Sequence, residues 1–373
     1  MTEKLFIVAA PGLEALTARE LATLGLTGVT VAGGMELRGG LDSIYRANLH
    51  LRTASRILVR LGEFYAAAFS ELRKKASRLP WERYLAPGQP VALRATCHKS
   101  RLYHSDAVIE RVLGAIGDRL GQAAPLSAWD EESEGQPPQG VVIRLANNLC
   151  TISVDSSGAL LHQRGYRLAT AKAPLRETLA AAMVLASGWD GRAPLLDPFC
   201  GAGTILIEAA LWARRIAPGK ARRFTFMDWP GFDASLWEAT LAAALAAERP
   251  LEAPLLGSDR DAGAIQFAAA NAVRADVAAD IEFSCRPLSA IAPPPGPGWL
   301  ITNPPYGVRV SAAKDLRNLY AQFGNILRRR CPGWQVAFLC NSVPLMRQTG
   351  FTLERSHSWS NGGVRVYLAR GVV

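Results

Sequence analysis

The chain has 373 residues, 49% of them hydrophobic, and a formal net charge of +10 at pH 7. That length exceeds one typical compact domain and suits two or three, and no apolar stretch is long enough for a transmembrane helix. The six cysteines include no Cys-x-x-Cys pair, which argues against structural zinc and a disulfide framework and for a reducing compartment. The positive charge favours a polyanionic partner.

The first half of the chain mixes expected strands and helices. Residues 1–11 fit a first strand better than a signal peptide, because the apolar run is short and an amphipathic helix with charged residues follows it. Residues 126–140 are acidic and rich in Gly and Pro, which predicts a surface loop. Residues 141–145 and 149–154 predict two adjacent strands joined by a hairpin-like turn.

From Pro174 onward, short apolar strands alternate with helices, and we find no solenoid-type repeat. That alternation predicts a parallel α/β sheet. The expected strands are 195–196, 254–257, 299–302, 334–340 and 364–369.

A glycine turn follows the first of these strands, in the sequence Asp-Pro-Phe-Cys-Gly-Ala-Gly-Thr at 197–204. Gly201 and Gly203 can adopt backbone angles closed to other residues, and they let a ligand approach the main chain. The turn opens a helix over 205–215, whose free N–H groups favour a negatively charged ligand group. Any tight strand-to-helix turn would use glycine, and the motif matches neither the phosphate-binding loop nor the dinucleotide fingerprint. Alone, it is a weak indication of a cofactor site.

A second turn, after the strand at 254–257, carries the carboxylates of Asp259 and Asp261. In α/β nucleotide sites a carboxylate at this place binds ribose hydroxyls. The simpler alternative is that either aspartate only caps the helix expected over 262–274. We favour Asp261 as the cap and Asp259 as the ribose ligand.

The sequence Asn303-Pro304-Pro305-Tyr306 follows the strand at 299–302 and suits methylation of an aromatic amine. Such a nitrogen is a poor nucleophile, because its lone pair is delocalised into the ring. The Asn303 side-chain oxygen and the Pro304 carbonyl could accept its two N–H bonds, the prolines stiffen the turn, and Tyr306 offers a face for stacking. The alternative is an ordinary Asn-Pro turn. With the glycine turn, the motif indicates methyl transfer from S-adenosylmethionine to an exocyclic amine.

Basic residues occur in clusters, at 73–75, 98–101, 214–223 and 328–330. The last cluster suits a helix carboxyl terminus and needs no nucleic acid. Residues 214–223 run into the aromatic stretch 224–229. Aromatic side chains beside basic ones suit stacking near a flipped base, but burial of those aromatics is an equally common alternative.

The glycine-turn motif at 197–204 and Asn-Pro-Pro-Tyr-Gly at 303–307 resemble those of class I amino-methyltransferases that carry a THUMP RNA-binding domain. The resemblance extends over nearly the whole chain, and it is strongest to the subfamily of large-subunit rRNA guanine-N2 methyltransferases. Further similar segments are 9–14 and 33–37 (ferredoxin-like region), 48–56, 80–82 and 98–105 (THUMP region), and 161–167 and 173–179 (junction to the methylase).

The resemblance implies a Rossmann-like class I methyltransferase domain (α/β) at 166–373. An α+β ferredoxin-like and THUMP RNA-binding module would precede it at 1–165, with THUMP itself at about 45–155. The implied function is transfer of a methyl group from S-adenosylmethionine to the N2 amine of a guanine in structured RNA, with 23S rRNA favoured. The protein would be cytoplasmic and use neither metal nor membrane, and the guanine would have to be unpaired or flipped out.

The expected site residues fall into three groups. They are catalytic residues Asn303, Pro304, Pro305 and Tyr306; cofactor-binding residues Asp197, Pro198, Phe199, Gly201, Gly203, Thr204, Asp259 and Arg260; and RNA-binding residues Arg52, Lys99, Arg101, Arg164 and Arg167. The chain departs from the family in one respect. The family usually places an Asp after the third strand to hold the adenine amino group, whereas the turn at Cys285-Arg286-Pro287 has no carboxylate. Adenine recognition there would rest on main-chain contacts.

Other functions stay open on the sequence. A tRNA guanine-N2 methyltransferase or an adenine-N6 methyltransferase could use the same motifs. A DNA adenine or protein-glutamine methyltransferase could also use Asn-Pro-Pro-Tyr, although the first half of the chain resembles an RNA-binding domain. The non-enzyme alternative is a catalytically silent RNA-binding or assembly factor, against which the intact motifs argue.

Overall fold

The computed structural model describes residues 2–130, 137–167, 175–306 and 313–373. The chain divides into two compact units, each discontinuous in sequence. The amino-terminal unit is Met1–Ala9, Ala18–Leu161 and Arg222–Ala242, and the carboxyl-terminal unit is Ala10–Thr17, His162–Ala221 and Ala243–Val373. The main crossover after Leu161 lies near the expected boundary at 165, but the two exchanged segments, 10–17 and 222–242, were not expected.

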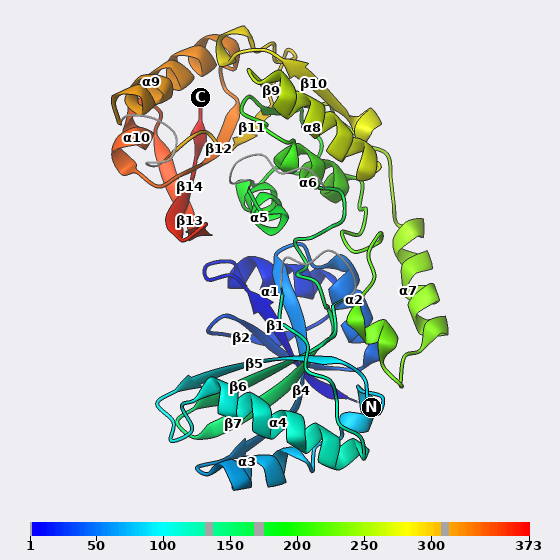
Figure 1. Ribbon diagram of the computed structural model, residues 1–373. Coiled ribbons are helices and arrows are strands. Elements are labelled where there is room, and N and C mark those ends of the chain that lie inside the picture. Colours follow the sequence, from blue (N-terminus) through cyan, green and yellow to red (C-terminus); the bar gives the residue numbers. More distant parts are fainter. Residues whose placement is uncertain (1, 131–136, 168–174, 307–312) are drawn as a thin grey trace. The chain divides into compact units, whose positions relative to one another are not determined.

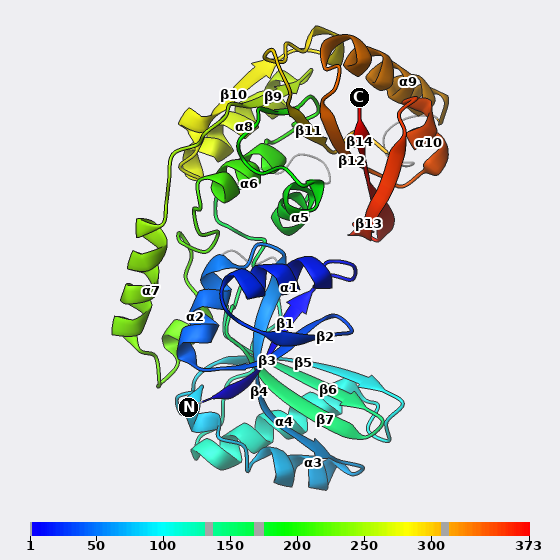
Figure 2. The same ribbon diagram turned by 180° about the vertical axis from the view of Figure 1, so that it is seen from behind.

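Within the described residues, the amino-terminal unit has a seven-stranded sheet in the order β2-β3-β1-β4-β7-β6-β5 (Figures 1 and 2). Its neighbours are antiparallel except β5 and β6, which are parallel. The expected hairpin is β6–β7, and residues 131–136 of the expected acidic loop lie outside the described residues. The strands are β1 (Glu3–Ala9), β2 (Gly28–Val31), β3 (Gly34–Gly39), β4 (Ala54–Tyr65), β5 (Val91–His98), β6 (Gln139–Ala146) and β7 (Leu149–Asp155).

Among the described residues of this unit, the helices are α2 (Leu41–His50), α3 (Phe69–Ala76) and α4 (Ser105–Leu120), and a short 3-10 turn η1 covers Trp81–Arg83. Helix α1 (Glu14–Thr23) is divided, because its first residues belong to the carboxyl-terminal unit and the part from Ala18 onward belongs to this one. Helix α4 packs against β5 and beside α3. Its buried residues Val108, Val112 and Ile116 recur at helical spacing, so one face enters the core. The helix ends at Gly121, whose φ of 74° permits the left-handed cap.

The carboxyl-terminal unit has a second sheet, which in the described part of the chain has the order β10-β9-β8-β11-β12-β14-β13. The first five strands are parallel, as expected. The expectation of an all-parallel sheet is wrong at the other edge, where β14 is antiparallel to both β12 and β13. Only Gly362 and Gly363 separate β13 from β14, and so short a connection joins antiparallel strands. The strands are β8 (Leu195–Asp197), β9 (Leu255–Asp259), β10 (Ile281–Cys285), β11 (Trp299–Thr302), β12 (Gln335–Cys340), β13 (Leu353–Asn361) and β14 (Val364–Val372).

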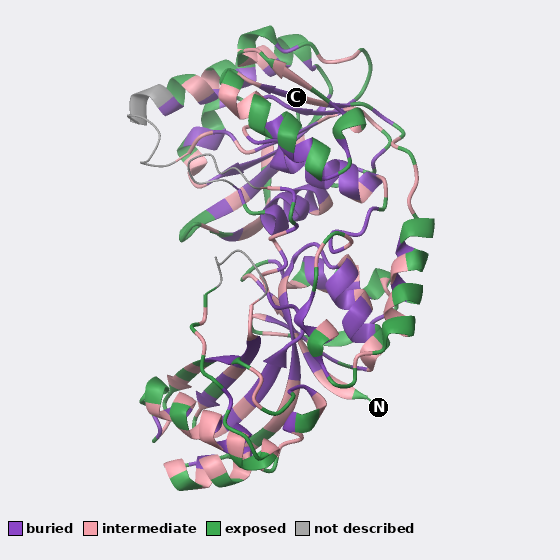
Figure 3. Cartoon of the chain, turned by 45° about the vertical axis from the view of Figure 1, so that its right-hand side comes forward, coloured by how far each residue is buried: buried purple, intermediate pink, exposed green. Residues whose placement is uncertain are grey.

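The helices of this unit are α5 (Glu177–Ser187), α6 (Thr204–Ala213), α8 (Ala262–Arg274), α9 (Ala313–Arg330) and α10 (Val343–Gln348), with 3-10 turns η3 (Ala278–Asp280) and η4 (Leu288–Ala290). Helix α6 is apolar nearly all round and almost wholly buried, as a core helix should be. Helix α9 has three basic residues in its last turn, 328–330, which is the dipole arrangement expected for them. Figure 3 shows the buried residues gathered along the strands and the inner sides of the helices.

The exchanged segment 222–242 completes the core of the amino-terminal unit. It contains η2 (Thr225–Asp228) and the first part of α7 (Ala234–Ala246). Phe224, Phe226 and Trp229 are buried, and Phe226 stacks on Tyr45 of α2 with ring centroids 4.5 Å apart. Of the two alternatives for these aromatics, burial is the one observed.

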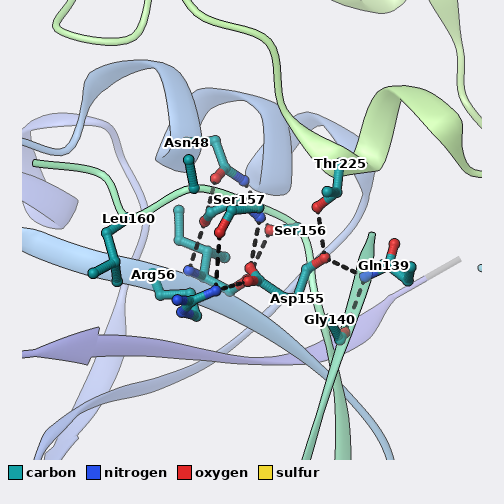
Figure 4. Close-up of polar contacts among 12 residues, drawn as sticks. Asn48, Arg56, Gln139, Gly140, Asp155, Ser156, Ser157, Leu160 and Thr225 are labelled. Atoms are coloured by element: carbon teal, nitrogen blue, oxygen red, sulfur yellow. Dashed lines mark hydrogen bonds and ion pairs between the residues drawn. The ribbon is translucent and has the colours of Figure 1, made fainter. Parts of the chain in front are cut away.

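Polar contacts at the carboxyl end of β7 fasten this segment and the elements around it (Figure 4). The Thr225 hydroxyl and the Gln139 side-chain amide donate to the Asp155 carbonyl at 2.9 and 2.7 Å. The Asp155 carboxylate forms a buried ion pair with Arg56 of β4. Asn48 of α2 donates to the Ser156 hydroxyl at 2.9 Å. The carboxyl end of β7 thus joins four parts of the unit: segment 222–242, β6, β4 and α2.

Candidate active site

The expected cofactor and catalytic motifs meet at one edge of the second sheet. Strands β9, β8 and β11 are neighbours and run parallel, so their carboxyl ends lie together. In open α/β sheets that edge is where ligands bind. The glycine turn and Asn303 directly follow β8 and β11, and Asp259 is the last residue of β9.

The glycine turn has the predicted strand–turn–helix form. Gly201 and Gly203 have φ values of 51° and 80°, in the left-handed region that favours glycine. A Cβ added at Gly201 would meet nothing within 4 Å, so one side of the turn is open. At Gly203 an added Cβ would come within 3.0 Å of the Phe283 ring. The open side offers room for a ligand beside the main chain.

The two aspartates at the carboxyl end of β9 have different roles. Asp261 caps α8, because its Oδ1 accepts from the Gly263 and Ala264 amides at 2.8 and 3.3 Å. Asp259 instead accepts from the Gly201 amide at 3.1 Å through Oδ2, and from the Asp261 amide at 3.0 Å through Oδ1. The cap is therefore confirmed, and Asp259 holds the glycine turn against β9.

Asp197 lies at the centre of the site and is 1% exposed. Its Oδ1 accepts from the Phe199 amide at 3.1 Å and from the Thr302 hydroxyl, which ties β8 to β11. Burial raises the pKa of Asp197 to about 7, although both hydrogen bonds act to lower it. Thr302 was not among the expected site residues; its place beside Asp197 depends on the pairing of β8 with β11.

Asn303 contributes a polar atom without a partner. Its Oδ1 is buried and accepts no hydrogen bond from the described residues. Leaving a buried acceptor unsatisfied costs about 1–3 kcal/mol, so such an atom in a folded protein needs an explanation. Its place after β11, next to the strand that carries Asp197, makes a ligand amine the natural donor.

Tyr306 is held by the far edge of the same sheet. Its hydroxyl accepts a hydrogen bond of 2.7 Å from the Asn361 side-chain amide, at the end of β13. Burial raises the pKa of Tyr306, so the hydroxyl stays neutral. Asn361 was not expected from the sequence, which carried no strand signal at 353–361. Residues 307–312, next along the chain, lie outside the described residues.

The region expected to receive adenine shows main-chain contacts. Arg286 donates its amide to the Asp259 carbonyl at 2.9 Å, and the Cys285 thiol lies 3.8 Å from the Arg260 carbonyl. These contacts join the ends of β9 and β10.

Among the described residues, no group of three or more His, Cys, Asp or Glu is placed to hold a metal ion. No described helix is both long and apolar enough to span a membrane.

The five residues expected to bind RNA divide into two groups. Lys99 and Arg101 are exposed in the loop between β5 and α4. Arg52 and Arg164 are 7% and 4% exposed. The side chain of Arg167 is 10% exposed and donates to Glu177 at 2.8 Å. Because the last three are packed inside the protein, we keep only Lys99 and Arg101 in the RNA surface proposed below.

Comparison with known proteins supports this picture along the chain. The sequence matches the RlmL ferredoxin-like domain over residues 4–58, the THUMP domain over 66–155 and the RMKL-like methyltransferase domain over 164–349. It is 36% identical to a Synechocystis sp. protein that bears the name of an RNA methyltransferase, slr0064, covering 99% of this chain and 96% of that one. The chain belongs to the THUMP-containing class I RNA methyltransferases.

Other members of the family are longer. Ribosomal RNA large subunit methyltransferase K/L of Methylococcus capsulatus is 36% identical over 99% of this chain, but the match covers 51% of that protein. The chain therefore spans about half the length of the K/L relatives.

Solved structures of the family share the fold. The crystal structure of SMU.472, described as a methyltransferase and complexed with SAH, superposes with a TM-score of 0.89 at 30% identity, covering 99% of this chain and 98% of that one. A Listeria monocytogenes protein described as an N6-adenine-specific DNA methylase gives a TM-score of 0.87 at 32% identity, covering 99% and 96%. The cofactor of this methyltransferase is accordingly S-adenosylmethionine.

Proposed function

We propose that this protein methylates the N2 amine of a guanine in structured RNA and that its substrate is large-subunit rRNA, 23S rRNA in bacteria. The observation that carries the proposal is the buried Oδ1 of Asn303 at the ligand-binding edge of the sheet, which has no partner among the described residues. The S-adenosylmethionine supplies an electrophilic methyl group on its sulfonium. The protein's own residues have to hold the cofactor, orient the amine and exclude water.

The residues around the glycine turn fit the cofactor. The open side of Gly201 and the amino terminus of α6 suit the carboxylate of the methionyl part. Asp197 and Asp259 offer carboxylate oxygens for its amine and ribose hydroxyls. The remaining proposed cofactor-binding residues are Pro198, Phe199, Gly203, Thr204 and Arg260, which lie in the two turns after β8 and β9.

Asn303 and Pro304 orient the target amine. When Asn303 Oδ1 and the Pro304 carbonyl accept the two N–H bonds, the nitrogen lone pair is aimed at the methyl group. The reaction then needs no strong base, because the methylated amine loses its proton readily. The rate enhancement comes from orientation of the amine and the cofactor in a site closed to water. Pro305 stiffens the turn, and the Tyr306 ring, held by Asn361, supports the flipped base from its face.

The amino-terminal unit would supply RNA affinity. Lys99 and Arg101, exposed in the β5–α4 loop of the THUMP domain, would contact phosphates. The rRNA assignment follows the names of the K/L relatives, and a cytoplasmic location follows from such a substrate. A tRNA guanine is the nearest alternative. Adenine N6 is the other, and it is the base named for the Listeria neighbour.

The decisive experiment is nucleoside mass spectrometry of separated rRNA and tRNA from a strain that lacks the protein. We expect N2-methylguanosine to fall in large-subunit rRNA alone. A loss confined to tRNA would move the substrate to the tRNA alternative. A loss of N6-methyladenosine, with N2-methylguanosine unchanged, would overturn the assignment of the base.

A further inference from the structure

The segment that follows the amino-terminal unit is tied to the helix that leaves the glycine turn. After Leu161 the chain enters the carboxyl-terminal unit. There the Arg164 Nε lies 3.4 Å from Glu208 Oε1, and the Tyr166 hydroxyl donates to the same oxygen at 3.1 Å. Glu208 is fully buried on α6, one turn beyond Thr204. These buried polar contacts fix the path of residues 164–167.

A second set of contacts leads from the same segment to the glycine turn itself. The Tyr166 carbonyl accepts from Arg274 Nε at 2.6 Å, and another guanidinium N–H of Arg274 donates to the Asn271 Oδ1. The other end of the Asn271 amide, Nδ2, donates to the Ala202 carbonyl at 3.1 Å. Ala202 stands between the two glycines of the turn. A continuous chain of hydrogen bonds therefore runs from Tyr166 to the turn.

Asn271 has the properties of a residue whose hydrogen bonds orient its neighbours. It is fully buried on α8 and makes hydrogen bonds through both ends of its amide. An apolar residue would fill the same space without needing two partners. Because the peptide unit is planar, a bond that holds the Ala202 carbonyl also sets the plane that contains the Gly203 amide. The Gly203 amide closes the turn onto the Cys200 carbonyl at 2.8 Å.

We propose that Asn271 is a positioning residue for the cofactor turn, and that the 164–167 segment sets Asn271 through Arg274. This inference rests on the glycine turn as the cofactor site, but not on the base or the RNA that is methylated. It also gives Arg164 a role that the sequence did not indicate. In this inference Arg164 helps to hold the turn through Glu208 and Tyr166, in place of the RNA contact expected from the sequence.

The test measures SAH affinity by calorimetry on the full-length protein. Asn271→Leu should weaken SAH binding about tenfold, the usual effect of losing one buried hydrogen bond and stranding its acceptor. Arg274→Leu should weaken it about threefold, because it leaves the contact to Ala202 in place. The double variant should bind like Asn271→Leu alone, since both changes act along one chain of contacts.

Arg328→Leu is the matched control. Arg328 also donates to an asparagine oxygen and to a carbonyl, those of Asn325 and Thr349, at 2.7 and 2.8 Å. It lies near the carboxyl end of α9, and these hydrogen bonds do not lead to the glycine turn. Its replacement should lower the melting temperature as much as Arg274→Leu does and leave SAH affinity unchanged. Arg274→Lys should recover part of the affinity.

Three results would overturn the inference: unchanged SAH affinity in both Asn271→Leu and Arg274→Leu, additive effects in the double variant, or an equal loss of affinity in Arg328→Leu. If Asn271→Leu does not fold, the inference is still tested by comparing the SAH affinity of Arg274→Leu with that of Arg328→Leu, because both arginines are exposed and their replacement should leave the protein folded. Failure of the proposed function looks different. It would leave these SAH affinities as expected and change only the nucleoside that is lost from RNA.

Discussion

Two buried aspartates, Asp155 in the amino-terminal unit and Asp197 in the carboxyl-terminal unit, lie in different surroundings. Asp155 pairs with the Arg56 guanidinium and also accepts from the Ser157 amide. The bonds to Asp197 come from the neutral Phe199 amide and Thr302 hydroxyl. Burial raises the pKa of both carboxyls, and only for Asp155 does a cation oppose it. A buried carboxylate that pairs with a cation of the same protein stabilises the fold, whereas one without such a partner can bind a cationic group of a ligand.

The polar atoms near each aspartate differ in the same way. Around Asp155, donors from Thr225 and Gln139 meet its main-chain carbonyl and complete a closed set of contacts. Near Asp197, the Oδ1 of Asn303 has no partner among the described residues. The first network can be satisfied by the protein alone, and the second needs a bound molecule. The following changes, ordered by expected size, test this comparison.

The largest effect is expected from Arg56→Ala, which leaves Asp155 buried and unpaired. Such a change should lower the free energy of unfolding of the amino-terminal unit by about 3–5 kcal/mol. Denaturant unfolding measures it, with Arg73→Ala as the control. Arg73 pairs with Asp118 at 2.7 Å, but both side chains are more than 40% exposed, so solvent screens the pair and the change should be far smaller. Equal effects would contradict a structural role for the Arg56 pair.

Asn303→Ala should abolish most turnover. It removes one of the two proposed acceptors of the target amine, a contact that matters most as the nitrogen becomes tetrahedral, and kcat should fall by about a hundredfold or more. Binding of SAH and RNA should change little, and the protein should gain stability from losing a buried, unpartnered oxygen. Near-normal turnover would make the motif an ordinary turn.

Asp259→Ala should weaken SAH binding by about 1–3 kcal/mol, since it removes the proposed ribose ligand and the acceptor of the Gly201 amide. Asp261→Ala is the control. It removes the helix cap and should lower stability by about 1 kcal/mol without a change in SAH affinity. Calorimetry and thermal unfolding on the same samples separate the two roles. If both variants bind SAH normally, Asp259 is not a cofactor ligand.

The pKa of about 7 for Asp197 predicts two pH effects. A buried acid with a raised pKa binds protons more tightly in the folded state, so its contribution to stability is present below about pH 4 and is lost as the pH rises to about 7. Asp197→Asn should therefore flatten the stability profile between those values. A cationic ligand group prefers the ionised carboxylate, so SAH affinity should rise up to about pH 7 and then level off in the wild type. The same pH profile in Asp197→Asn would exclude this residue as its source.

The smallest effect concerns the hydrogen bond between Asn361 and Tyr306. Tyr306→Phe and Asn361→Ala each break it and should reduce kcat/KM by a similar few-fold, on the order of one hydrogen bond. Tyr306→Ala removes the ring as well and should be far more damaging if the ring face supports the base. If kcat/KM falls as far in Tyr306→Phe as in Tyr306→Ala, the contribution of Tyr306 comes from its hydroxyl and not from its ring face.

Local signals in the sequence determined much of the catalytic half. The apolar runs at 195–196 and 299–302 form β8 and β11 where expected, and glycine at 201 and 203 occupies left-handed backbone conformations. Asp261 caps its helix because a side-chain oxygen can reach the amides two and three residues on. These features depend on residues close together in the sequence, which is why the sequence alone could place them.

Tertiary structure alone decided which charged residues face solvent and which are enclosed. Arg164 and Glu208 are 44 positions apart, and Asn361 and Tyr306 are 55 apart. Arg101 and Arg164 were both expected to bind RNA, but Arg101 is exposed, whereas Arg164 is buried beside Glu208. The polar segment 353–361 became a strand because β14 pairs with it. Burial and pairing depend on which elements meet in space, and no local pattern of side chains carries that information.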